Sequence, residues 1–200
     1  MYGFMSPGLR AKMSKSRARS DAIRDGVRTI VMGATNLNEL ARAIIANSAF
    51  APVANILQAI SEADAHAKPS TAAGSAPHSI YDEVWHLAFW QDVTLDWVQG
   101  KPTPYPEHAS EGFPTDASEP WESLRERFLA GTQNAAAIAN DTERLEIEVA
   151  CPRPNEPQRS MTVREQLESL AAHNGYHLGR VVLLRQLLGN WPPPDGGDTW

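Results

Sequence analysis

The stretch TVREQLESLAAHNGYHLGRVVLLRQLLG, residues 162–189, carries the clearest helix pattern in the chain. Thr162 and Glu165 have the spacing of a capping box at a helix start, and Gly189 suits a helix end. Between these limits, residues with one helical face in common recur every three or four positions: Leu167, Leu170, Asn174, His177, Val181, Leu184 and Leu188. This pattern predicts a long helix with one face turned to a core.

Three further segments have a helical pattern. The first covers residues 37–62, where Pro52 should kink the helix or divide it in two. The second begins at Ser79, a suitable cap, and runs to a stop at Gly100. The third covers residues 121–140. No internal repeat is visible, and four helices of this kind predict an all-α four-helix bundle.

The segments between the predicted helices differ in character. Residues 63–77 are rich in Ala, Ser, Pro and Gly and should form a loop. Residues 101–120 contain five prolines and form a long middle connection, of a length at which loops are often functional. The alternating LEIEVA at 145–150, followed by RSMTV at 159–163, predicts a small hairpin or an extended crossover.

Composition limits the class of protein. The chain has 200 residues, 42% hydrophobic and 21% charged, which suits one compact soluble domain, or one domain with tails. It has no apolar run long enough to span a membrane and no secretory signal, so we expect no membrane partner and a cytoplasmic location. The single cysteine, Cys151, excludes an internal disulfide, and we expect an incidental thiol in a loop.

Charge is distributed unevenly along the chain. Residues 1–28 hold seven basic and two acidic residues, which leaves 11 basic and 22 acidic residues in the remainder. An acidic body argues against nucleic acid as a partner. The basic head could be a nucleic-acid arm or a transit-like segment. We favour a disordered extension over residues 1–32, with Met32 as an alternative start, and a single domain over residues 33–200.

Two histidines in the last predicted helix have the spacing of metal ligands. His173 and His177 are one turn apart, so both rings can reach one point. Two imidazoles leave an ion under-coordinated, and His86 in the second predicted helix is a candidate third ligand. By itself, each of these histidines is more often an ordinary core or surface residue. Their occurrence together on two predicted core helices strengthens the hypothesis of a shared metal site.

Three motifs, HSIYDEVWHLAFW at 78–90, HNGYHLGRVVLLRQLLGNWPPP at 173–194 and GGDTW at 196–200, resemble the DinB/YfiT-like family of metalloenzymes. The likeness covers residues 37–200. It implies a four-helix bundle with a divalent metal held by three histidines, which correspond here to His86, His173 and His177. The sequence departs from the family at Arg180, where relatives commonly have glutamine.

The resemblance also guides expectations about function. An ion held by three neutral imidazoles keeps an open position and can polarise a bound group, activate water or hold a thiolate. The resemblance favours a transferase that uses a low-molecular-weight thiol, or a hydrolase, with zinc or nickel as the metal and a small-molecule substrate. The alternative is a non-catalytic, stress-associated bundle in which the metal is structural or absent. We expect a homodimer in either case.

Two kinds of residue near the histidines have open roles. Arg180, three residues after His177, is a candidate for binding an anionic group of the substrate, although it could equally be a surface arginine. Asp82 and Glu83 precede His86 by about one turn. Either could accept a hydrogen bond from a ligand or act as a base, but both also suit the first turn of a helix.

Overall fold

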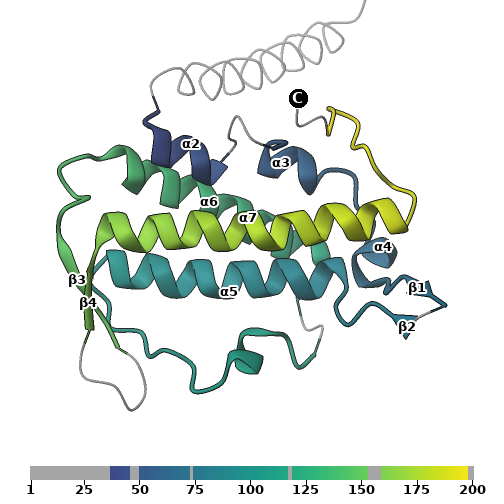
Figure 1. Ribbon diagram of the computed structural model, residues 1–200, viewed down its shortest axis with the longest axis horizontal. Helices are drawn as coiled ribbons and strands as arrows, with labels where there is room; N and C mark the ends of the chain where they lie inside the picture. Colours follow the sequence, from purple (N-terminus) through teal and green to yellow (C-terminus); the bar gives the residue numbers. More distant parts are fainter. Residues whose placement is uncertain (1–36, 46–49, 73, 117–118, 153–158, 198–200) are drawn as a thin grey trace, which may run out of the picture. The chain divides into compact units, whose positions relative to one another are not determined.

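The computed structural model describes residues 37–45, 50–72, 74–116, 119–152 and 159–197. The chain separates into two compact units, residues 1–37 and 38–200, and the structure discussed below is that of the second unit. The predicted basic extension, residues 1–32, lies outside the described residues. Most of the described chain is helical (Figure 1).

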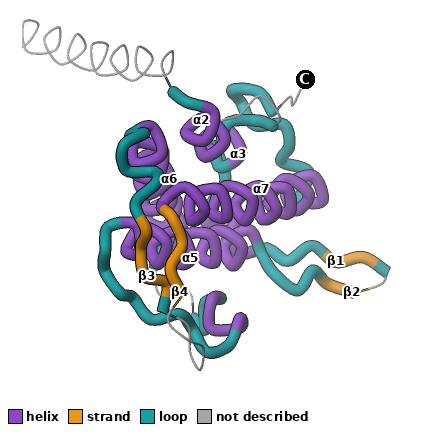
Figure 2. The backbone as a smooth tube through the Cα atoms, turned by 60° about the vertical axis from the view of Figure 1, so that its left-hand side comes forward, coloured by secondary structure: helices purple, strands orange, loops and turns teal. Residues whose placement is uncertain are grey.

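Three long helices agree with the sequence predictions: α5 (Ile80–Val98), α6 (Trp121–Asn140) and α7 (Val163–Leu187). Both α5 and α7 begin with a complete capping box, formed by Ser79 with Asp82 and by Thr162 with Glu165. Helices α5 and α7 lie side by side over most of their length, and α6 packs against α5 (Figures 1 and 2). The pair α5 and α7 therefore forms the frame on which the histidines stand.

The prediction of one helix over residues 37–62, kinked or divided in two at Pro52, is wrong. The described residues from 37 to 66 form three short helices instead, α2 (Glu39–Ile45), α3 (Val53–Ile56) and α4 (Glu62–His66). Pro52 immediately precedes α3 in an extended conformation, with ψ of 140°, because its ring blocks a helix that would pass through it. A second break follows Ile56, where Ala59 has a positive φ of 53°.

Two small antiparallel ribbons accompany the helices. Strands β1 (Ser70–Thr71) and β2 (Gly74–Ser75) pair within the predicted loop at 63–77, and β3 (Glu148–Cys151) pairs with β4 (Arg159–Thr162). The second ribbon is the predicted hairpin. We expected Cys151 to lie in a loop, and this prediction is wrong. Cys151 is the last residue of β3, and 2% of its surface is exposed. The alternation of LEIEVA extends through Ala150 to Cys151, which places the thiol on the inner face.

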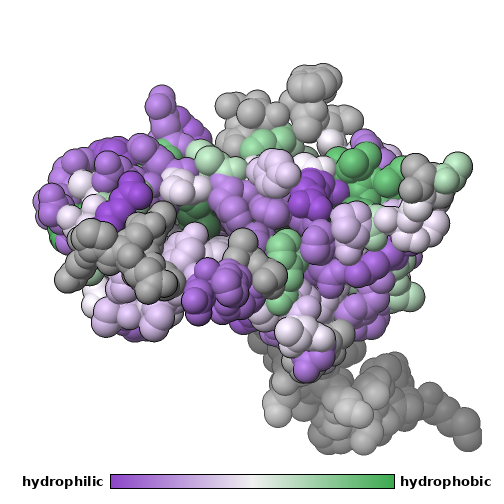
Figure 3. Space-filling view, turned by 60° about the horizontal axis from the view of Figure 1, so that its bottom comes forward, coloured by the Kyte–Doolittle hydropathy of each residue, from purple (hydrophilic) through white to green (hydrophobic). Residues whose placement is uncertain are grey.

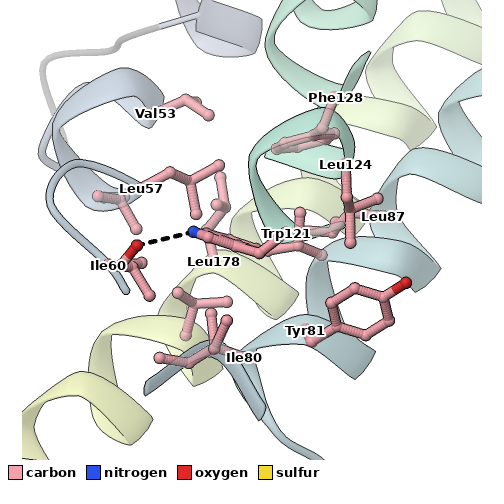
Figure 4. Close-up of a cluster of buried hydrophobic side chains, with 14 of the residues drawn as sticks. Val53, Leu57, Ile60, Ile80, Tyr81, Leu87, Trp121, Leu124, Phe128 and Leu178 are labelled. Atoms are coloured by element: carbon pink, nitrogen blue, oxygen red, sulfur yellow. Dashed lines mark hydrogen bonds between the residues drawn. The ribbon is translucent and has the colours of Figure 1, made fainter. Parts of the chain in front are cut away.

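A hydrophobic core joins the first half of α5 and the last half of α7 to α3, α4 and the start of α6 (Figure 4). Trp121 of α6 is 2% exposed, and its Nε1 donates to the carbonyl of Ile60 at 2.9 Å. Ile80 and Leu87 of α5 and Leu178 of α7 are fully buried nearby. Each such side chain contributes about 1.5–3 kcal/mol. This core fixes α5 against α7 up to the level of the histidines.

The outer surface contrasts with this core. In the view of Figure 3, hydrophilic residues predominate and hydrophobic residues lie in separate patches. In the described part of the chain, no helix combines the length and the apolar character needed to cross a membrane.

Candidate metal centre

The structure brings together the three histidines that the sequence singled out. His86 extends from α5, and His173 and His177 extend from α7. Each ring offers one nitrogen to a common point, and these three atoms lie within 4.8 Å of one another. The ring centroids are 4.5 Å apart for His86 and His177, and 4.6 Å apart for His173 and His177.

The spacing of the nitrogens suits a small divalent cation. Nε2 of His86 lies 3.1 Å from Nε2 of His173. Two nitrogens bound to one zinc ion at about 2.1 Å, with a tetrahedral angle between them, would be about 3.4 Å apart. The observed separation therefore needs only a small adjustment to admit an ion. Imidazole nitrogens are also ligands that zinc and nickel accept well.

The ring of His86 is held from the side opposite the other histidines. Its Nδ1 donates to the carbonyl of Gly112 at 2.7 Å, which leaves the lone pair of Nε2 directed at His173. Phe113 stacks on the same ring, with centroids 4.2 Å apart. A side chain at Gly112 would have its Cβ 2.7 Å from Nε1 of Trp90, so only glycine allows this approach of the loop.

His177 is oriented by a buried carboxylate. Its Nδ1 donates to Oε2 of Glu83 at 2.7 Å, and the Glu83 side chain is 0% exposed. The other oxygen of Glu83 lies 2.8 Å from Nη2 of Arg180. Because the carboxylate occupies Nδ1, Nε2 of His177 keeps its lone pair for the common point. A carboxylate behind a ligand histidine also makes that histidine a stronger electron donor.

Burial keeps the rings of His86 and His173 in the uncharged form that binds metals. His86 and His177 are 7% and 6% exposed, and His173 is half-buried. Burial lowers the pKa of His86, partly offset by the carbonyl of Gly112. Burial, and then the nearby His177 and His86, lower the pKa of His173 to about 4. At neutral pH these two imidazoles are therefore unprotonated, as a metal ligand must be.

A cavity of about 460 Å³ begins at the histidines. His86 and His173 form one end of it, and Trp90, Trp97 and Tyr105 contribute aromatic walls. A purely structural metal site is normally closed by four protein ligands, whereas a catalytic one keeps a position for water or substrate. An ion held by these three histidines would have an open coordination position, and a cavity lies beside them.

The other candidate residues take different positions. Arg180 is about one-third exposed and contacts Glu83 rather than lining the cavity, so its binding of a substrate anion stays a prediction. Asp82 caps α5 by accepting from the backbone of Ser79. Of the two acidic residues Asp82 and Glu83, Glu83 is the one that contacts a histidine of the cluster, His177. His78 stacks on Phe113, on the ring that also touches His86.

Some parts of the site had no clear signal in the sequence. Gly112 and Phe113 lie in the long middle connection, whose proline content indicates only a surface loop. Arg159 of β4 and Cys151 of β3 line the cavity from the hairpin. The inward alternation of the hairpin could have placed Cys151, but no local pattern says that the hairpin faces α5 and α7.

Comparison with known protein families matches residues 49–181 to the DinB superfamily. The matched region contains all three histidines together with Glu83 and Gly112. No curated protein matches the chain significantly.

Proposed function

Because the chain belongs to the DinB superfamily, we propose that it is a metal-dependent enzyme that acts on a small molecule. The observation that carries this proposal is the convergence of His86, His173 and His177 at one end of a cavity. We assign the fold as a four-helix bundle in which α2 is the first helix, since α2 packs against both α6 and α7.

Each residue of the site has a separate task in this proposal. His86, His173 and His177 would hold a divalent ion, zinc or nickel, through Nε2. Glu83 and the carbonyl of Gly112 fix two of the rings, so that the lone pairs are aligned before a ligand arrives. The aromatic walls of the cavity exclude water from the bound substrate.

The reaction we favour is the transfer of a thiol to an electrophile. Bound beside the cavity, the ion would supply a positive charge that favours the thiolate over the thiol at neutral pH. The rings of His86 and His173 are unprotonated at neutral pH and so would not protonate a thiolate at that end, because burial lowers their pKa values. Hydrolysis by metal-activated water is the second reaction, since the same open position suits water.

The reaction class is tested with protein loaded with zinc or nickel. Loss of free thiol is followed for cysteine, glutathione and coenzyme A with an epoxide and an aryl halide, and hydrolysis is followed with an aryl ester. Thiol consumption that depends on the metal and disappears in His177→Ala supports the transferase. Metal-dependent ester cleavage without thiol consumption supports the hydrolase.

A non-catalytic protein with a structural metal is the competing function. Burial of Glu83 and His177 favours it, because an ion that joins α5 to α7 would strengthen the fold. Alanine variants of His86, His173 and His177 distinguish the two. Variants that lose metal but keep their helical circular dichroism and melting temperature support the enzyme, and variants that unfold support the structural role.

A further inference from the structure

The cavity extends from the histidines toward the β3–β4 hairpin. Along α7 its lining residues share one face, from His173 back through Leu170 to Gln166. Along α5 the lining runs from His86 to Trp97. At 1.5 Å per residue, these stretches are roughly 10 Å and 16 Å long. The cavity is therefore elongated, with the candidate metal ligands at one end.

The hairpin closes the other part of the cavity with its inner face. Cys151 and Arg159 are directly opposite each other in the ribbon, and Met161 lies two residues farther on the same face. All three line the cavity. The amide of Gln166 donates to the sulfur atoms of Cys151 and Met161, which fixes the hairpin against α7. The backbone of Arg159 is therefore paired with that of Cys151, a buried residue that Gln166 holds in place.

Arg159 places a positive charge at the hairpin end of the cavity. Its side chain is exposed, and the described residues make no ion pair with it, although its charge contributes to the lowered pKa of Glu165. No carboxylate occurs among the described residues that line the cavity. The chain as a whole has a net charge of -6. Because Arg159 is the charged side chain among the described lining residues and no carboxylate lies beside it there, this end of the cavity favours an anionic group.

We propose that the cavity binds an elongated anionic thiol, whose sulfur lies at the histidine cluster and whose carboxylate or similar anionic group pairs with Arg159. This inference rests on the thiol-transferase function proposed above and adds the chemical class of the thiol. The middle of the ligand is apolar, because Trp90, Trp97 and Leu170 line the space between the two polar ends.

The test uses the full chain loaded with cobalt, whose absorption reports a thiolate bound to the metal. Omega-mercaptocarboxylates, from mercaptopropionate to mercaptoundecanoate, are titrated beside the mercaptoalcohols of the same length. We expect the longer carboxylates to bind about tenfold more tightly than the alcohols, the effect of one charge-assisted hydrogen bond. Arg159→Gln should remove this preference, and Arg159→Lys should keep part of it.

Arg164→Gln is the matched control. Arg164 lies close in the chain and pairs with Glu146 on the surface, and it does not line the cavity. This variant should keep the full preference for carboxylates. If carboxylates and alcohols bind equally well to the natural chain, or if Arg159→Gln keeps the preference, the anionic site is wrong while thiol binding stands. If no thiol produces the thiolate absorption, both proposals fall together.

Discussion

Replacing Glu83 by glutamine should weaken zinc binding at the three histidines by about 10- to 100-fold. The Glu83 carboxylate is 0% exposed and serves two partners, with one oxygen 2.7 Å from Nδ1 of His177 and the other 2.8 Å from Arg180. Glutamine has nearly the same volume but only one acceptor oxygen and no charge. It therefore cannot serve both the ring N–H and the guanidinium.

The size of the effect follows from these contacts. A hydrogen bond to a charged group contributes about 1.5–3 kcal/mol. Part of that energy holds His177 in the orientation that directs Nε2 at the common point. A loss of about 1.4–2.7 kcal/mol corresponds to the expected 10- to 100-fold change in affinity. The side chain is fully buried, so solvent does not screen the interaction.

The assay is a competition titration of zinc between the protein and a chromophoric chelator at neutral pH. Glu146→Gln is the control, because it removes one negative charge from an exposed ion pair with Arg164. It should bind zinc as the natural chain does. Circular dichroism and thermal melting verify that both variants are folded. A folded Glu83→Gln variant with unchanged zinc affinity would refute the role assigned to the carboxylate.

Three further predictions concern the loop, the pH response and the packing of α7. Gly112→Ala should reduce zinc affinity because its Cβ would meet Trp90, whereas Gly179→Ala, with nothing within 4 Å, should not; the same chelator titration compares them. In the metal-free protein, the lowered pKa of His173 makes the unfolded chain the better proton acceptor. The contribution of His173 to the free energy of unfolding should therefore be fully present above pH 6.5 and be lost as pH decreases from 6.5 toward about 4, and His173→Gln should make the decline measured in urea titrations less steep. Arg185→Met should lower the free energy of unfolding by about 1–3 kcal/mol, since the side chain is buried and donates to three oxygens; urea titration in which the variant is as stable as the natural chain would contradict this.

Long periodic segments allowed most of the helical framework to be predicted. The capping boxes and apolar faces of α5 and α7 are local features, and they gave the two elements that carry the histidines. The segment at 37–62 was predicted less well. Its apolar spacing is helical throughout, but Pro52 and the left-handed backbone at Ala59 divide it, and only the proline is visible in the sequence.

The candidate metal ligands were predictable because their residue type and spacing are local, whereas the residues that support them depend on tertiary contacts. His173 and His177 share a face of one helix, so their convergence follows from helical geometry. Gly112 lies 26 residues after His86 in the chain, within the proline-rich connection that follows α5, and no periodicity indicates that this loop returns to the His86 ring. For Glu83, the sequence allowed either a role in the first turn of the helix or contact with a candidate ligand. The packing of α5 against α7 brings it into contact with His177.

The metal content of the full chain, purified without an affinity tag, tests the central claim most directly. Elemental analysis after exposure to zinc or nickel and removal of loosely bound ions should find about one ion per chain, as expected for a single three-histidine site. His177→Ala, with unchanged helical circular dichroism, should retain almost none. A natural chain that retains no ion, or a His177→Ala chain that retains as much as the natural one, would contradict the claim.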